Sequence, residues 1–171
     1  MRNVQLVHAQ HRPADAPRAL RLLAHDLELA ANVGTLFRLA DALGVERLHL
    51  TGRTPAPPDA RLRKAARSTD AHVPWERGDD PLAVVAALRA GGWRIVSLEL
   101  TTASIDVRAL PVAPGDRLCL VLGAEGAGVA QALLDASDAT VHIPMRGRNS
   151  SMNVASAAAI ALFELSRHLV G

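Results

Sequence analysis

Aromatic side chains are scarce in this chain of 171 residues: they make up 2% of it, and tyrosine is absent. Many modules that read single-stranded RNA stack its bases on phenylalanine or tyrosine, so this scarcity argues against such a platform. Lysine is nearly absent too, since Lys64 is the only one. The formal net charge is only +2 although the sequence pI is about 9.4, because few groups titrate between histidine and arginine. Whether the protein has a basic patch must therefore be judged from where its arginines and its single lysine lie in the sequence.

Cysteine and long apolar runs are lacking as well. Cys119 is the only cysteine, which excludes an intramolecular disulfide and a cysteine-based zinc site, and we expect it to be an inert core residue. Only His8 and His11 among the histidines are close in sequence, so we expect no metal site. No segment approaches the roughly 18 apolar residues that span a bilayer, and no signal peptide is apparent. We expect a cytoplasmic protein without membrane contact.

Hydrophobic residues make up 49% of the chain, enough for a core, and the length fits one domain. Residues 1–17 are polar and contain two prolines, so we predict a short N-terminal extension with one candidate strand at Val4–Ala9. Residues 18–171 are predicted to form a single domain without a separate RNA-binding domain.

From Arg18 onward, strand-like segments alternate with helix-like ones, which predicts an α/β domain with a parallel sheet and helices on both faces. Leu118–Leu122 is uniformly apolar and is expected at the centre of the sheet. Asn32 is expected to cap its helix. The expected strands are Leu20–Leu27, Val45–Leu50, Arg94–Leu100, Leu118–Leu122 and Thr140–Ile143, and the expected helices are Asn32–Leu43, Asp80–Ala90, Val129–Ala136 and Asn153–Leu169.

The segment between residues 51 and 67 shows no clear period and is the most basic part of the chain. Its only acid is Asp59, and its basic residues are Arg53, Arg61, Arg63, Lys64 and Arg67. Two interpretations stay open: a solvated loop, or a contact with nucleic acid.

A glycine-rich turn follows the central strand, over Leu120–Gly128. Strand, glycine turn and helix is the arrangement of a nucleotide-phosphate site, but Glu125 stands where a dinucleotide fingerprint has glycine. Since a carboxylate repels a pyrophosphate, the turn suits a ligand that is not a polyanion. The alternative interpretation is that the segment binds no ligand and contains glycines only because a tight turn requires them.

Two further stretches could bind a ligand. Ile143–Asn153 leaves a strand at a proline and enters a helix through two serines and an asparagine, and helix capping by Ser150 or Ser151 would explain only part of it. Arg38 lies inside the first helix, on its polar side, where arginine often serves solubility alone.

Together these stretches resemble the SpoU-type (TrmH-type) RNA methyltransferases of the SPOUT superfamily. Asn32–Val45 resembles their first signature, Leu120–Gly128 the second, and Ile143–Met145 with Ser151–Val154 the third, in the same order and with similar spacing. Thr54–Pro58, Lys64, Val73–Glu76 and Val96–Glu99 resemble one branch, and the similarity covers roughly residues 18–167.

The resemblance implies a homodimeric enzyme that transfers a methyl group from S-adenosylmethionine to a ribose 2′-hydroxyl of tRNA or rRNA. It also implies a C-terminal deep trefoil knot, a rare exception to unknotted folding. The cofactor carries a sulfonium cation and no phosphate, which removes the objection raised by Glu125. The implied cofactor-binding residues are Leu98, Glu99, Gly123, Gly128, Ile143, Met145, Ser151 and Met152.

Arg38 is the implied activator of the ribose hydroxyl, with Asn32, Glu125, Ser151 and Asn153 orienting it, the ribose and the loops. An arginine is a poor base at its ordinary pKa. It either has a strongly depressed pKa, acts with a substrate phosphate, or clamps the phosphate and the forming oxyanion. We expect RNA contacts from Arg53, Arg61, Arg63, Lys64, Arg67, Arg146 and Arg148.

The chain departs from the family pattern at two places: Glu28–Asn32 lacks the proline found in many members, and Ala66–Thr69 replaces a Leu-Gly-Ala-like turn. The second departure affects target choice, and the sequence does not distinguish tRNA from rRNA. Two other hypotheses stay open: a catalytically silent relative acting in RNA assembly, and an α/β enzyme that binds another nucleotide.

Overall fold

The computed structural model describes residues 3–5, 7, 10 and 17–169. Of the candidate strand Val4–Ala9, residues 4, 5 and 7 are described and are not in a strand, while residues 6, 8 and 9 lie outside the described residues. Within the described part of the chain, no helix combines the length and the apolar character needed to cross a membrane.

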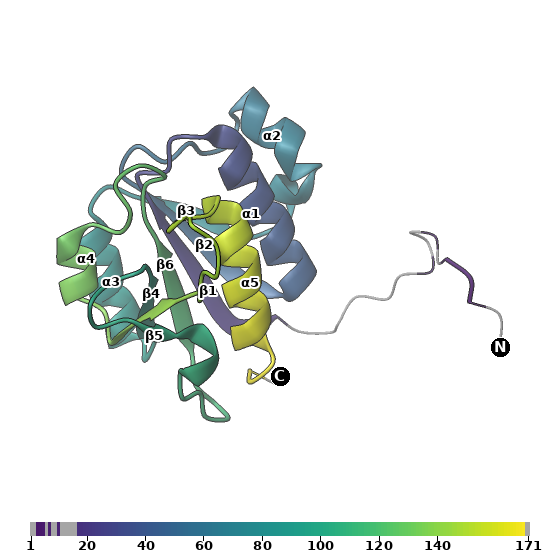
Figure 1. Ribbon diagram of the computed structural model, residues 1–171. Coiled ribbons are helices and arrows are strands. Elements are labelled where there is room, and N and C mark those ends of the chain that lie inside the picture. Colours follow the sequence, from purple (N-terminus) through teal and green to yellow (C-terminus); the bar gives the residue numbers. More distant parts are fainter. Residues whose placement is uncertain (1–2, 6, 8–9, 11–16, 170–171) are drawn as a thin grey trace.

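A parallel sheet of seven strands forms the centre of the molecule (Figure 1), and its strand order is β3-β2-β1-β6-β4-β7-β5. All six strand pairs are parallel. The strands are β1 Arg18–His25, β2 Val45–Thr51, β3 Trp75–Gly78, β4 Arg94–Leu98, β5 Ile105–Asp106, β6 Leu118–Leu122 and β7 Ala139–His142. The predicted parallel α/β fold is confirmed, and β6 occupies the expected central place.

Helices cover both faces of this sheet (Figure 1). The helices are α1 Ala30–Leu43, α2 Ala60–Ala66, α3 Pro81–Ala90, α4 Gln131–Asp135 and α5 Val154–Ser166, with 3-10 turns η2 Thr69–Ala71 and η3 Val107–Ala109. Successive side chains of a strand point to opposite faces of the sheet, so the cluster in which each side chain packs shows which helices cover that face. Leu20 and Leu22 of β1 pack in one cluster with α1, α2 and α5, whereas Leu23 packs in the other with α3 and α4.

The loop interpretation of residues 51–67 is wrong for its second half, which forms α2. The carboxylate of Asp59 accepts hydrogen bonds from the backbone N–H groups of Arg61 and Leu62 and so caps this helix. Seven residues make only two turns, and only Leu62 and Ala66 are buried, so the apolar period was too short to recognise.

The N-cap prediction for Asn32 is also wrong. Helix α1 begins at Ala30, its N-cap is Leu29, and Asn32 is a buried residue of the first turn whose side chain bonds elsewhere. Likewise Asn153, rather than Ser150 or Ser151, caps α5. The edge strands β3 and β5 were missed because they are short and half-exposed.

Candidate active site

Three loops meet at one edge of the sheet. Strands β6, β4 and β7 are neighbours and parallel, so the segments that follow Leu98, Leu122 and His142 leave from the same carboxyl edge. In open α/β sheets this edge is where ligands bind. The segment between Ile143 and Asn153 then returns to the start of α5, which packs against α1 on one face of the sheet.

A hydrogen-bond network joins the three sequence motifs at this edge. Glu125, in the glycine-rich turn, accepts from the backbone N–H groups of Glu28 at 2.8 Å and Leu29 at 3.2 Å. It also accepts from the amide of Asn32 at 2.8 Å, and Asn32 in turn accepts from the amide of Asn153 at 3.0 Å. Residues that are 93 and 121 positions apart are thereby held together.

The Glu125 carboxylate replaces a local cap at the beginning of α1. Leu29 has no side chain that could bond the free N–H groups there, and the positive end of the helix dipole favours an anion at this place. Burial raises the pKa of Glu125, but the hydrogen bonds from Glu28, Asn32 and Leu29 outweigh it, so the pKa lies below its ordinary value. The group is therefore ionised at neutral pH.

The glycine-rich turn is closed tightly upon itself. Gly128 adopts a left-handed φ of 71°, and a Cβ at Gly123 would lie 2.1 Å from the carbonyl oxygen of Gly128. Glu99, at the end of β4, accepts from the backbone N–H of Val129 at 2.9 Å, and a Cβ on Gly128 would lie 2.3 Å from its carboxylate. The two turns thus fit together only because these positions are glycine.

Arg38 and Ser151 stand outside this network. Both are exposed, and neither side chain has a hydrogen bond or ion pair within the described part of the chain. Arg38 follows Gly34 by one turn, on the flank of α1 against which α2 packs. Asn32, Glu125 and Asn153 therefore share a site within one chain, while Arg38 faces solvent beside α2.

The segment 26–29, which carries Glu28 and Leu29, is held from its other side by contacts that the sequence analysis did not predict. Asp26 has a left-handed φ of 55°, and its carboxylate accepts from the backbone N–H of Arg53 at 2.7 Å. The buried hydroxyl of Thr54 accepts from the N–H of Leu27 at 3.1 Å. No motif spacing marks these contacts, because Asp26 and Thr54 meet only when β1 and β2 pair.

This chain is matched by the model of the SpoU rRNA methylase family over residues 19–163. It belongs to that family. It is 30% identical over 163 residues to the 23S rRNA (guanosine(2553)-2′-O)-methyltransferase RlmP of Bacillus subtilis, a match that covers 94% of this chain and 64% of that protein. The chain spans between half and about two thirds of the length of the curated relatives it matches.

Solved structures of family relatives have the same fold. An S-adenosylmethionine-bound rRNA methyltransferase from Sinorhizobium meliloti matches with a TM-score of 0.82 and 30% identity, over 89% of this chain and 57% of that one. A structure described for the 2′-OH methylation of C/U34 on tRNA matches with a TM-score of 0.78 and 28% identity, over 90% and 98% of the two chains.

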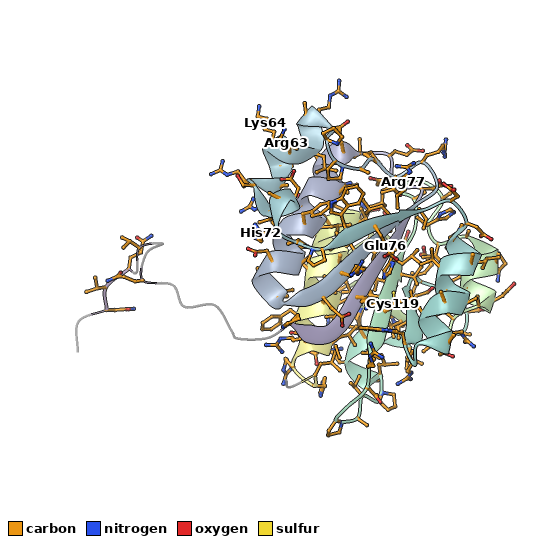
Figure 2. All side chains as sticks on the ribbon, turned by 180° about the vertical axis from the view of Figure 1, so that it is seen from behind. Arg63, Lys64, His72, Glu76, Arg77 and Cys119 are labelled. Carbon is orange, nitrogen blue, oxygen red and sulfur yellow. The ribbon has the colours of Figure 1, made fainter. Side chains whose placement is uncertain are left out.

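The remaining SpoU-motif residues lie at the same edge. Leu98 ends β4, and Ile143, Met145 and Met152 lie on the loop that follows β7. The basic residues Arg53, Arg61, Arg63, Lys64, Arg67, Arg146 and Arg148 are all exposed. Figure 2 shows Arg63 and Lys64 projecting from α2. Within the described ranges, no group of three histidine, cysteine or acidic residues could hold a metal.

Proposed function

We propose that this protein transfers a methyl group from S-adenosylmethionine to a ribose 2′-hydroxyl of tRNA or rRNA. One observation carries the proposal: the Asn32–Glu125–Asn153 network joins the three SpoU motifs at the ligand-binding edge of the sheet. The relatives named as 2′-O-methyltransferases, and one bound to S-adenosylmethionine, support the same reaction. A tRNA or rRNA substrate would place the protein in the cytoplasm.

The loops at this edge fit the cofactor. The glycine-rich turn offers backbone approach at Gly123 and Gly128, and Leu100 and Met152 leave apolar surface exposed beside it. Glu99 and Glu125 make the surroundings acidic, which suits a sulfonium cation and would repel a polyphosphate. We assign cofactor contacts to Leu98, Glu99, Gly123, Gly128, Ile143, Met145, Ser151 and Met152. When bound, the cofactor supplies the electrophilic methyl group and a neutral thioether leaving group.

The chain's own residues must align the ribose hydroxyl and help it lose its proton. We assign this role to Arg38, either as the group that takes up the hydroxyl proton or as a clamp for the phosphate and the forming oxyanion. Asn32, Glu125, Ser151 and Asn153 orient the loops and the ribose. Because Arg38 lies outside the network in one chain, we infer that RNA or a second subunit completes its surroundings.

RNA recruitment is assigned to the exposed arginines and to Lys64, within a single domain over residues 18–171. Arg61, Lys64 and Arg67 on and beside α2 have no carboxylate within 4.0 Å among the described residues, so their charges are available to phosphates. The ion pairs of Arg53 with Asp26 and Glu28 are long, at 3.8 and 3.9 Å. Recognition would then depend on phosphates, ribose and RNA shape.

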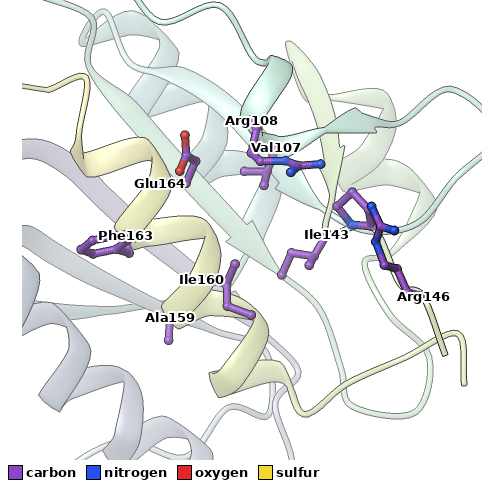
Figure 3. A pocket seen from close by; sticks show the side chains of 9 residues that line it. Val107, Arg108, Ile143, Arg146, Ala159, Ile160, Phe163 and Glu164 are labelled. Atoms are coloured by element: carbon purple, nitrogen blue, oxygen red, sulfur yellow. The ribbon is translucent and has the colours of Figure 1, made fainter.

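We also propose a homodimer built on α5. Phe163 and Ile160 of this helix are 60% and 45% exposed, and they line a pocket of about 510 Å³ together with Val107, Ile143 and Arg146 (Figure 3). An apolar helix face of this kind is typical of an interface. Light scattering at micromolar concentration should give twice the chain mass, and Phe163→Asp should give a monomer. A monomeric wild type contradicts the proposal.

The sheet order supports the trefoil knot that we propose for the C-terminal part. Strand β6 enters between β1 and β4, β7 lies beyond β4, and α5 then crosses back to pack on α1. A crystallographic chain trace that is unknotted when its ends are joined would contradict the threading.

The reaction is tested by incubating the purified protein with labelled S-adenosylmethionine and total cellular RNA, followed by mapping of 2′-O-methylation. Arg38→Ala should abolish transfer, whereas cofactor at 100 times its dissociation constant should still stabilise the variant by about 2.7 kcal/mol. The matched control is Arg89→Ala, which removes a surface arginine of α3 that pairs with Asp138. RNA binding without methyl transfer would favour a catalytically silent RNA-binding relative. Thermal stabilisation by NAD or ATP but not by S-adenosylmethionine would contradict the proposed cofactor.

A further inference from the structure

A groove runs along α3 on the face of the sheet opposite α1 and α5. Its volume is about 670 Å³, within the range of about 300–1,000 Å³ typical of small-molecule sites. Helix α3 supplies an apolar wall between Ala83 and Leu88. We call it the α3 groove; its other lining residues include Arg21, His49, Glu76, Asp79, Trp93 and Arg117. The function proposed above uses none of them.

A buried histidine without a hydrogen-bond partner lies in this lining. His49 of β2 is 2% exposed, and neither ring nitrogen has a partner among the residues that the structure describes. Glu76 Oε1 is 2.7 Å from Nδ1, but not in a direction that makes a hydrogen bond. Burial lowers the pKa of His49, although Glu76 opposes the shift, so the ring is neutral and offers one donor and one acceptor. Buried polar atoms of this kind are normally paired with protein, water or a ligand.

The two ends of the α3 groove carry opposite charges. Glu76 pairs in register with His49, and Asp79 follows β3 at the carboxyl edge of the sheet. Arg47 donates a hydrogen bond to Oε2 of Glu76 at 3.0 Å, but each carboxylate oxygen can accept a further hydrogen bond. Figure 2, seen from behind, labels Glu76 on this edge strand. Arg117 precedes β6 at the amino edge and stacks on Trp93, 4.4 Å from the ring centroid. A ligand along the groove would therefore meet carboxylates at one end and a guanidinium at the other.

Arg117 is the basic group that remains available to an anion. Arg21 also stacks on Trp93, but its charge is paired with Glu46. Arg117 bonds only the carbonyl of Gly91 and has no carboxylate within 4.0 Å in the described part of the chain. A guanidinium held over an indole ring is well placed to bind a phosphate.

We propose that the α3 groove binds a guanine nucleotide, with the base edge on Glu76, His49 beside it, and the 5′-phosphate on Arg117. Guanine is the base that presents two adjacent donors, N1–H and the N2 amino group, to a carboxylate acceptor. Adenine and cytosine place a ring-nitrogen acceptor beside their amino group, and uracil flanks its N–H with two carbonyls. A carboxylate therefore disfavours these three.

The nucleotide can come from solution or from an RNA chain, since both present the same base edge and phosphate. The inference does not depend on methyl transfer, because the groove and the Glu125 network lie on different parts of the sheet. Binding by wild-type protein is measured by titration calorimetry with 5′-GMP, guanosine, 5′-AMP and 5′-UMP. We expect one GMP per chain, bound at least 10-fold more tightly than AMP or UMP, and weaker binding of guanosine.

Glu76→Gln and Arg117→Ala should each weaken GMP binding at least 10-fold. Both side chains are at least partly exposed, so the variants should fold. Matched controls are Asp135→Asn on α4 and Arg89→Ala on α3, which should leave binding unchanged because neither side chain lines the groove. Saturating S-adenosylhomocysteine should not displace GMP.

Photocrosslinking of an RNA oligonucleotide containing 6-thioguanosine separates the two sources. A crosslink to groove peptides that GMP suppresses assigns the groove to RNA, and GMP binding without such a crosslink assigns it to the free nucleotide. The proposal is overturned if GMP does not bind at millimolar concentration, if all bases bind equally, if S-adenosylhomocysteine displaces GMP, or if the controls weaken binding as much as Glu76→Gln.

Discussion

Replacing Glu125 by glutamine should detach the beginning of α1 from the glycine-rich turn. The carboxylate accepts three hydrogen bonds, from Glu28, Leu29 and Asn32. A carboxamide of the same shape turns an N–H₂ group toward one of these donors and removes the charge. Each hydrogen bond to a charged group contributes about 1.5–3 kcal/mol. Because this site is partly exposed, we expect the substitution to lower the free energy of unfolding by about 1–3 kcal/mol in total.

For a domain of this size, such a loss corresponds to a decrease in Tm of about 2–12 °C at pH 7. The effect should depend on pH with a defined sign. The folded pKa of Glu125 is lowered, so its contribution is present above the ordinary pKa of 4.5 and is lost as the pH falls through the folded value. The difference between wild type and Glu125→Gln should therefore be largest at neutral pH and shrink in acid.

The assay is calorimetric unfolding of both proteins at several pH values, together with the methyl-transfer rate. Misplacement of a reacting group by about 1 Å can cost about 100-fold in rate, so we expect transfer to fall about 10- to 100-fold. Asp135→Asn, which removes a surface carboxylate that accepts a hydrogen bond from Gln131 and from no other described residue, should change neither quantity. Wild-type stability and rate in Glu125→Gln at pH 7 would refute the role given to the network.

Three other changes follow from local geometry. Gly123→Ala would place a Cβ 2.1 Å from the Gly128 carbonyl oxygen, so the variant should lose cofactor binding in a thermal-shift assay, whereas an unchanged shift would contradict the tight turn. Asp59→Ala removes the cap of α2 and should lower the free energy of unfolding by about 1 kcal/mol, while Asp59→Asn should retain most of it in denaturant titrations. Burial raises the pKa of Cys119 to about 12, so a thiol reagent at pH 8 should label it only after unfolding, and rapid labelling of native protein would contradict its burial.

Local patterns were sufficient for the long, regular elements. Helix α3 spans Pro81–Ala90, within one residue of the predicted Asp80–Ala90, because its cap Asp80, Pro81 and the terminal glycines act within a few residues of each other. The uniformly apolar β6 is central because both of its faces are covered by helices. Short elements at the periphery, such as β3, β5 and α2, have too few buried positions to show a period.

The candidate site, too, was predictable only in part. The order of the motifs in the chain pointed to Asn32, Glu125 and Asn153, but not to the contacts between them. Asn32 was predicted as a helix cap, because a local pattern cannot show that its side chain donates instead to a carboxylate 93 positions away. Thr54 belongs to a family-like stretch, but its contact with Leu27 and the contact of Asp26 with Arg53 could not be predicted, since both depend on the pairing of β1 with β2.

The sequence by itself thus determined the α/β class, the scarcity of base-stacking aromatics and the restriction of basic charge to arginine and one lysine, because these depend on composition and short-range period. Only the tertiary structure decided the strand order, the network around Glu125 and the bipolar α3 groove. Each of these joins residues from strands and loops that are distant in the chain, and a pattern within one segment carries no information about which other segment packs against it.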